Sequence, residues 1–286
     1  MKAFVIARLT FREALRKRMI WGVLALSLLF VLLYFWGFTQ VKAEFLRIEA
    51  TRGAQRGSGQ IITFELISTI MVRLGFYTIN FLAGVMTIFA SVGTIAGEIE
   101  SGTFQAIVPK PIARWELVVG KFLGFAGMIV GYIAIMATAV LLASRVVANY
   151  TPANFLGGTA LVMLVSLVLL SLTVLGSTIF QTMANGVVVF MLYGGALLGG
   201  LLETMGSFLN INSLIRTGVI TSLILPSDVI WRLASSILQP NSSLRFDSPI
   251  PIAVARAPSN AMVVYAVGYI VVMVSLAVVS FRRRDL

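Results

Sequence analysis

About six long apolar runs dominate this chain, and they restrict its fold more than any other feature. Each run approaches the roughly 20 apolar helical residues that cross a hydrocarbon layer of about 30 Å. Because a backbone in lipid must satisfy its own hydrogen bonds, a helix fits every run. We therefore predict an all-α polytopic membrane protein, with a single membrane domain over residues 1–286. The predicted spans are Met19 to Phe38, Phe76 to Ala96, Phe122 to Ser144, Phe155 to Phe180, Gly186 to Leu202 and Ala261 to Phe281.

Composition supports this class and narrows the chemistry. Hydrophobic residues make up 58% of the chain and charged residues 12%, with a mean hydropathy of +0.96, which excludes an ordinary soluble domain. The sequence has no cysteine and no histidine. Disulfides, thiolate chemistry and metal or proton transfer through these groups are therefore excluded, and we predict no metal site.

The positions of lysine and arginine predict the orientation. About half of these 22 residues lie close to helix ends on the side of the N-terminus. Most of the others fall in two long segments, 39–75 and 203–260, and long loops carry little weight in the positive-inside rule. We therefore predict a multi-pass protein of the cell membrane, with both termini on the cytoplasmic side and both long loops on the outer side. The net charge of +11 is explained by anionic headgroups, so lipid is an expected partner and nucleic acid is not.

Residues 1–18 precede the first span and carry a basic stripe. Arg8, Arg12 and Arg16 repeat at every fourth position, so they share one side of a helix. An adjoining apolar face comprises Phe4, Ala7, Phe11, Ala14 and Leu15. This pattern predicts an amphipathic helix in the cytoplasmic interface. A plain cluster of topogenic charges is the alternative.

Residues 97–121 form a compact polar insert between the second and third spans. Glu98 and Glu100 end the second span, and the step from Ser101 to Thr103 supplies capping chemistry for a new short helix. Pro109 and Pro111 then end that helix.

One face of the predicted short helix is apolar. Phe104, Ile107 and Val108 stand at i, i+3 and i+4. A helix so short cannot bury this face alone, so we expect it to contact another protein. A merely solvated cytoplasmic loop is the alternative.

No catalytic or nucleotide-binding pattern is found. A phosphate loop needs Gly, four residues and then Gly-Lys-Ser/Thr. Around the Gly120-Lys121 pair, Trp115 stands where the first glycine is required, and Phe122 stands where Ser or Thr is required. The acidic residues, such as Glu65 and Glu203, show no spacing that suggests hydrolysis in the membrane. The chain is therefore predicted not to be an enzyme, and any ATP must bind another subunit.

Small residues mark two predicted spans. Glycines recur at spacings of three and four in the third span, and at a spacing of four in the fifth, which favours close helix approach in lipid. This leaves open whether they pack within one chain or form a homodimer seam. The glycines are Gly120, Gly124, Gly127, Gly131, Gly195 and Gly199.

Two further groups have open interpretations. In the 203–260 loop, Ser227 or Asp228 is expected to cap a helix that rests Val229 and Trp231 on the membrane surface, as a lid or as a packing shield. The fourth span has five hydroxyls that either line a substrate path or bond backbone. They are Ser166, Ser171, Thr173, Ser177 and Thr178.

The run from Ile95 to Gly124 resembles the cytoplasmic signature of membrane subunits of type-2 ATP-binding-cassette exporters. It is similar in particular to the branch grouped with permeases for multicopper-enzyme maturation, such as nitrous oxide reductase assembly. Glutamates, a Ser-Gly-Thr step, a proline and an arginine recur in that order. The rest of the chain matches by layout, and the element from Pro226 to Asp228 resembles a recurring feature of the branch.

The resemblance implies roles for particular residues. In this family a short coupling helix docks on an ATPase subunit. The resemblance implies that Gly102, Thr103, Phe104 and Ile107 form this helix. Glu98 and Glu100 would lie at its entry, and Pro109, Pro111 and Arg114 at its exit. Two copies of the chain would work with two ATPase subunits that bind ATP and magnesium, so no cofactor is expected in this chain.

The leading interpretation is thus the permease subunit of an ATP-driven exporter that works by alternating access. A second is an ATPase-driven complex that transmits force to an external accessory protein without passing a substrate. A third is a secondary transporter or channel, which the scarcity of membrane carboxylates disfavours.

Overall fold

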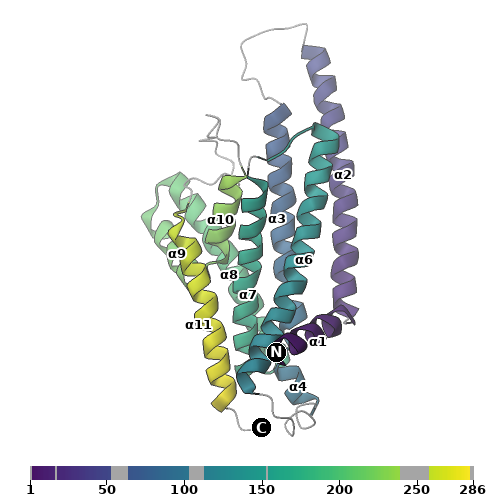
Figure 1. The fold of residues 1–286 in the computed structure, drawn as a ribbon. Coiled ribbons are helices and arrows are strands. Elements are labelled where there is room, and N and C mark those ends of the chain that lie inside the picture. The colour runs from purple at the N-terminus through teal and green to yellow at the C-terminus, as the bar shows by residue number, and fades with distance from the viewer. Residues whose placement is uncertain are drawn as a thin grey trace.

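The structure is a computed structural model that describes residues 2–16, 18–52, 64–102, 113–152, 154–238 and 258–283. In these ranges it is built from helices alone, most of them running along one common direction (Figure 1). Among the described residues, six helices are long and apolar enough to cross a membrane, which confirms the all-α polytopic class. The main helices are α2 (Arg18–Arg52), α3 (Phe64–Ser91), α6 (Arg114–Ala148), α7 (Phe155–Ile179), α8 (Thr182–Leu209) and α11 (Ala261–Arg283).

Both ends of the described chain lie at the same end of the bundle. Helix α1 (Lys2–Arg16) runs across this end at a steep angle to the spans, and α11 finishes nearby (Figure 1). The short helix α4 (Ala96–Glu100) lies at the same end, which we call the inner end. An even number of spans brings the two termini together in this way.

The described parts of the two predicted loops are largely helical. In the 39–75 segment, α2 continues to Arg52 and α3 already begins at Phe64. In the 203–260 segment, α8 continues to Leu209 and is followed by α9 (Asn212–Ile224) and α10 (Ser227–Ile237). The apolar cores of the spans set the sequence-based boundaries. The helices extend further because polar residues at their ends also form backbone hydrogen bonds.

Helices α9 and α10 form a sharply bent pair, with an angle of 103° between them. Leu225 at the bend is extended, as expected for a residue before a proline, and Pro226 is the N-cap residue of α10. The predicted cap by Ser227 or Asp228 is wrong, because α10 has no side-chain cap bond. The expected surface position of Trp231 is also wrong. Its ring is buried and contacts the Tyr77 ring edge to face, with the two ring centroids 5.7 Å apart.

The core is centred on α3 and α7. In the most apolar stretch of each span, 72% of the residues are buried in α3 and 61% in α7, against 11% in both α2 and α11. The fourth-span hydroxyls do not open a polar path there. Ser171, Thr173, Ser177 and Thr178 each donate to a backbone carbonyl of α7 itself, at 2.7–2.8 Å. Ser166 is fully buried and has no hydrogen-bond partner among the described residues.

Candidate functional site

The second candidate span is broken near its inner end. Helix α3 ends at Ser91 and α4 begins at Ala96, so residues 92–95 interrupt the helical ladder. The carbonyl oxygens of Val92 and Thr94 receive side-chain donors from other helices in place of helical N–H groups. Because a buried carbonyl without a donor is costly, these side chains are what make the break tolerable.

Lys121 of α6 supplies the first donor. Its ammonium group contacts both the carbonyl oxygen of Thr94 and the carboxylate of Glu98. The lysine side chain is only 7% exposed and the glutamate 21%. A buried cation needs both charge compensation and hydrogen bonds, and here one carboxylate and one carbonyl provide them. This contact fastens α4 to α6.

Asn185 of α8 supplies the second donor. Its amide nitrogen donates to the carbonyl of Val92 at 2.9 Å and to that of Thr173 in α7 at 3.1 Å. The residue is completely buried. Gly176 makes this approach possible, because a Cβ at that position would overlap the Asn185 amide oxygen. One side chain therefore joins the break to both α7 and α8.

Glu100 ties the end of α4 to the start of α8. Its two carboxylate oxygens accept from the backbone N–H and the hydroxyl of Thr182, both at 2.9 Å. Thr182 is the first residue of α8, so the negative charge lies at the positive end of the helix dipole. Together, Glu98, Glu100, Lys121, Thr182 and Asn185 form what we call the inner joint.

The structure reaches only part of the predicted coupling segment. Ser101 follows α4 and Gly102 has a φ of +69°, so these two residues end α4, and the short helix that we predict after them lies outside the described residues. Thr103, Phe104, Ile107, Pro109 and Pro111 lie outside the described residues. The segment resumes at Ala113, one residue before α6.

Arg114, the predicted exit residue, contacts the last turn of α11. Its guanidinium donates to the carbonyls of Phe281 and Arg282 at 3.2 and 3.0 Å, and it lies 5.8 Å from the centre of the Phe281 ring. A cation suits the negative end of a helix. The chain leaving the coupling segment is therefore fastened to the C-terminal helix.

Helix α1 packs across α6 next to the inner joint. A Cβ at Gly124 would lie 2.6 Å from the carbonyl oxygen of Ala7 and 2.8 Å from Cβ of Thr10, so this glycine permits the contact. Thr10 and Ala14 are buried. Arg8, Arg12 and Arg16 are exposed, as is Phe4. The basic stripe and part of the apolar face thus both remain accessible.

The other predicted packing glycines divide into two groups. Gly120 is buried in α6, and Gly199 lies so close to α9 that a Cβ there would overlap the Thr221 side chain. Gly127, Gly131 and Gly195 have no atom of the described residues within 4 Å of an added Cβ. In the described part of the chain, the first group therefore packs between helices, and the second group faces outward.

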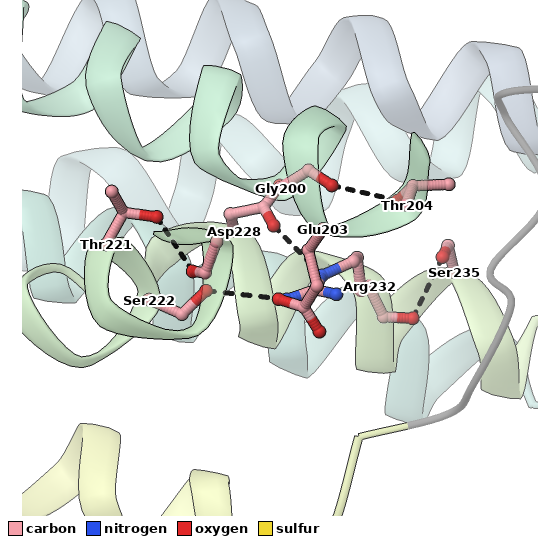
Figure 2. Close-up of polar contacts among 9 residues, drawn as sticks. Gly200, Glu203, Thr204, Thr221, Ser222, Asp228, Arg232 and Ser235 are labelled. Carbon is pink, nitrogen blue, oxygen red and sulfur yellow. Dashed lines mark hydrogen bonds and ion pairs between the residues drawn. The ribbon is translucent and has the colours of Figure 1, made fainter. Parts of the chain in front are cut away.

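A second polar cluster lies toward the other end of the bundle, between α8, α9 and α10 (Figure 2). Arg232 contacts three groups: Asp228 at 2.9 Å, Glu203 at 2.7 Å and the Ser222 hydroxyl at 3.4 Å. The Arg232 and Asp228 side chains are 11% and 8% exposed. We call these four residues the outer charge cluster. Two carboxylates share one guanidinium, so the cluster carries a net charge of −1.

Sequence reasoning missed most of both clusters. Lys121 was considered as one of the orienting charges and as part of an incomplete phosphate-loop pattern, and Asp228 as a helix cap at the membrane surface. Asn185 was not considered at all. The available signal was position: polar residues that fall inside or beside apolar runs are costly unless they have partners. Their partners come from distant parts of the sequence, so spacing along the chain did not reveal them.

These features describe a multi-pass membrane bundle in which a broken helix at the inner end is held by its neighbours. A family model described as "ABC-2 family transporter protein" matches residues 4–286. The chain therefore belongs to the ABC-2 transporter family, as the membrane component of an ABC transporter that partners with an ATPase subunit. This domain is not the catalytic part of such a transporter. No curated protein matches the chain.

Proposed function

We propose that the chain is the permease subunit of an ATP-driven exporter in the cell membrane, with both termini in the cytoplasm. Two copies would work with two separate ATPase subunits. Lysine and arginine placement supports this orientation. The resemblance of residues 95–124 to permeases for multicopper-enzyme maturation favours a place in that branch, although the chain has neither cysteine nor histidine to offer copper.

The inner joint carries this proposal. The coupling helix is predicted to follow directly after Glu100, so a push on it acts first on α4. Lys121, Asn185 and Glu100 connect this region to α6, α7 and α8, so the displacement passes to three spans together. A break in the second span lets α4 move without bending the whole of α3. Closure of the ATPases on ATP would drive this motion, and hydrolysis would reverse it.

A second copy of the chain is expected beside the exposed spans. Gly127, Gly131 and Gly195 face away from the chain's own helices, and α2 and α11 expose most of their apolar surface. Small residues favour close helix contacts in lipid. Membrane lipid would cover the surface that the second copy leaves free. The transport path would then lie between the two copies.

Force transmission without transport is the second candidate function. Its support is the apolar filling of the described interior, where most fourth-span hydroxyls bond their own helix. In that case the bent α9–α10 pair would act on an external accessory protein. Measuring ATP-dependent efflux from vesicles separates the two functions, because only an exporter moves a solute.

Purification under gentle conditions tests the core of the proposal. We expect an ATPase to co-purify with the tagged chain and to be lost from the variant Phe104→Asp/Ile107→Asp, whose predicted docking face becomes charged. A matched control is Phe4→Asp, which adds a charge on exposed α1. A correctly folded chain that repeatedly purifies alone, under conditions that preserve known complexes, would overturn the proposal.

A further inference from the structure

Helices α9 and α10 belong to different packing units, although they are adjacent in sequence. Helix α9 packs closely on α8, since a Cβ at Gly206 would meet Leu214 at 2.8 Å and one at Gly218 would overlap Glu203. Helix α10 packs on α7 and α3. A Cβ at Gly157 would lie 3.2 Å from Ile237, and Trp231 contacts Tyr77. The inner part of α8 is held against α7 by Asn185 and against α3 by Tyr193, which lies on Gly84. Toward the outer end, a seam separates the α8–α9 unit from the unit of α3, α7 and α10, with the bend at Leu225 and Pro226 joining them.

The outer charge cluster crosses this seam (Figure 2). Glu203 and Ser222 belong to the α8–α9 unit, whereas Asp228 and Arg232 belong to α10. The pair between Arg232 and Glu203 links the two units. The ion pair between Arg232 and Asp228 lies within α10, at i, i+4 spacing, so it stays intact when α10 moves relative to α8.

This unequal arrangement lets the seam open at a low electrostatic cost. A buried guanidinium that loses its only carboxylate is left uncompensated, which strongly opposes separation. Here Arg232 keeps Asp228 after it leaves Glu203. Asp228 also sits directly on Gly200 of α8, where even a Cβ would overlap its carboxylate, so the closed seam is tightly packed. The contact is thus close but breakable.

We propose that Glu203 and Arg232 form a latch between the two units, with Asp228 as the resting partner of Arg232 when the latch is open. This proposal deepens the proposed function, on which it rests: the latch closes the outer side of the permease and opens when the coupling segment moves. The inner joint provides the connection, because Glu100 holds the first residue of α8, and Asn185 ties the break in the second span to both α8 and α7. Helix α8 tilts about this inner attachment, so that its outer end carries Glu203 away from Arg232.

The latch model predicts opposite effects for two isosteric substitutions. Glu203→Gln removes the link across the seam and leaves Arg232 with Asp228, so the seam opens more often. Asp228→Asn removes the resting partner and leaves Glu203 as the only carboxylate for Arg232, so the seam stays closed. A purely structural cluster would be loosened by both changes, because each removes an ion pair.

Cysteine labelling measures the seam directly, because the chain has no natural cysteine. Ser235 is buried on the same side of α10 as Asp228 and Arg232, and it donates to the Arg232 carbonyl at 2.9 Å. Ser235→Cys is the reporter, and a water-soluble maleimide is the probe. Ala234→Cys, fully buried on another face of α10, is the matched control for general loosening.

We expect Glu203→Gln to speed Ser235→Cys labelling about fivefold or more, the population change that loss of roughly one kcal/mol produces. Asp228→Asn should slow it, and Ala234→Cys should stay protected in both. Faster labelling of both reporters in both variants would overturn the latch, as would no change in either. This measurement on the isolated chain does not require the ATPase, so its result is independent of the proposed function.

Nucleotide then tests the place of the latch in the transport cycle. In the complex with its co-purifying ATPase, a non-hydrolysable ATP analogue should speed Ser235→Cys labelling without exposing Ala234→Cys. If the two isosteric variants behave as expected but nucleotide has no effect, the latch exists and its role in coupling is refuted. Loss of ATPase co-purification would instead refute the proposed function.

Discussion

The inner joint and the outer charge cluster compensate the free-energy cost of burying polar groups in different ways. In the inner joint, Lys121 and Asn185 donate to backbone carbonyls that a broken helix has left free. In the outer charge cluster, side chains neutralise one another, and Arg232 has two carboxylates to choose from. Backbone carbonyls cannot exchange partners without unfolding, whereas Arg232 can. The inner contacts therefore suit a permanent connection, and the outer contacts suit a reversible one.

The largest effect is expected for Arg232→Met. This change leaves Glu203 and Asp228 close together in a mostly buried site without a cation. We expect a loss of about 4 kcal/mol in the free energy of unfolding, as for breaking a buried ion pair. Thermal unfolding of the purified protein measures it. Arg216→Met is the control, because Arg216 is exposed on neighbouring α9. Equal losses in both variants would show that the outer charge cluster is not a special site.

A slightly smaller loss is expected for Lys121→Met, at about 3 kcal/mol, because Glu98 is more exposed than Asp228 and water compensates part of its charge. Adding Glu98→Gln should restore only part of the stability. The carbonyl of Thr94 still lacks its donor in the double variant. Full recovery would mean that the inner joint depends on charge alone, and the contrast between the two clusters would fail.

Asn185→Leu tests the part of the inner joint that has no charge. It removes donors from the carbonyls of Val92 and Thr173, and the branched side chain no longer fits against Gly176. We expect a loss of about 2 kcal/mol, from two unmade hydrogen bonds and some overpacking. Met183→Leu on the exposed side of α8 is the control. Unchanged thermal unfolding of Asn185→Leu would contradict the anchoring of the break.

The sequence predicted the spans but not the ends of the helices. Hydropathy identifies residues that lipid or core requires to be apolar, and this was enough for all six spans. It does not report where a backbone ladder stops. Helix α10 shows the limit most clearly: its Ser227 and Asp228 look like a cap, but the Pro226 bend turns the helix into the bundle, where Asp228 meets Gly200.

The candidate site was predicted only at its borders. Glu98 and Glu100 were selected because they end an apolar run, and both are part of the inner joint. Their partners Lys121, Thr182 and Asn185 come from α6 and α8, and only the packing of three helices brings them together. Periodicity describes one helix at a time, so it shows which face is polar but not what that face meets.

The smallest change in stability is expected for Glu100→Gln, and this variant sharpens the comparison most. Glutamine keeps an acceptor for Thr182 but loses the charge at the start of α8. The expected cost is only about 0.5 kcal/mol, because the site is exposed and screened. Its effect on coupling should be larger than its effect on stability, since Glu100 lies at the entry of the predicted coupling helix and contacts the start of α8. With the ATPase bound, ATP hydrolysis should continue while nucleotide-dependent labelling of Ser235→Cys weakens.

If hydrolysis and labelling instead both remain at the level of the parent protein, Glu100 is only a helix cap, and the connection from the inner joint to the outer charge cluster passes through Lys121 and Asn185 alone.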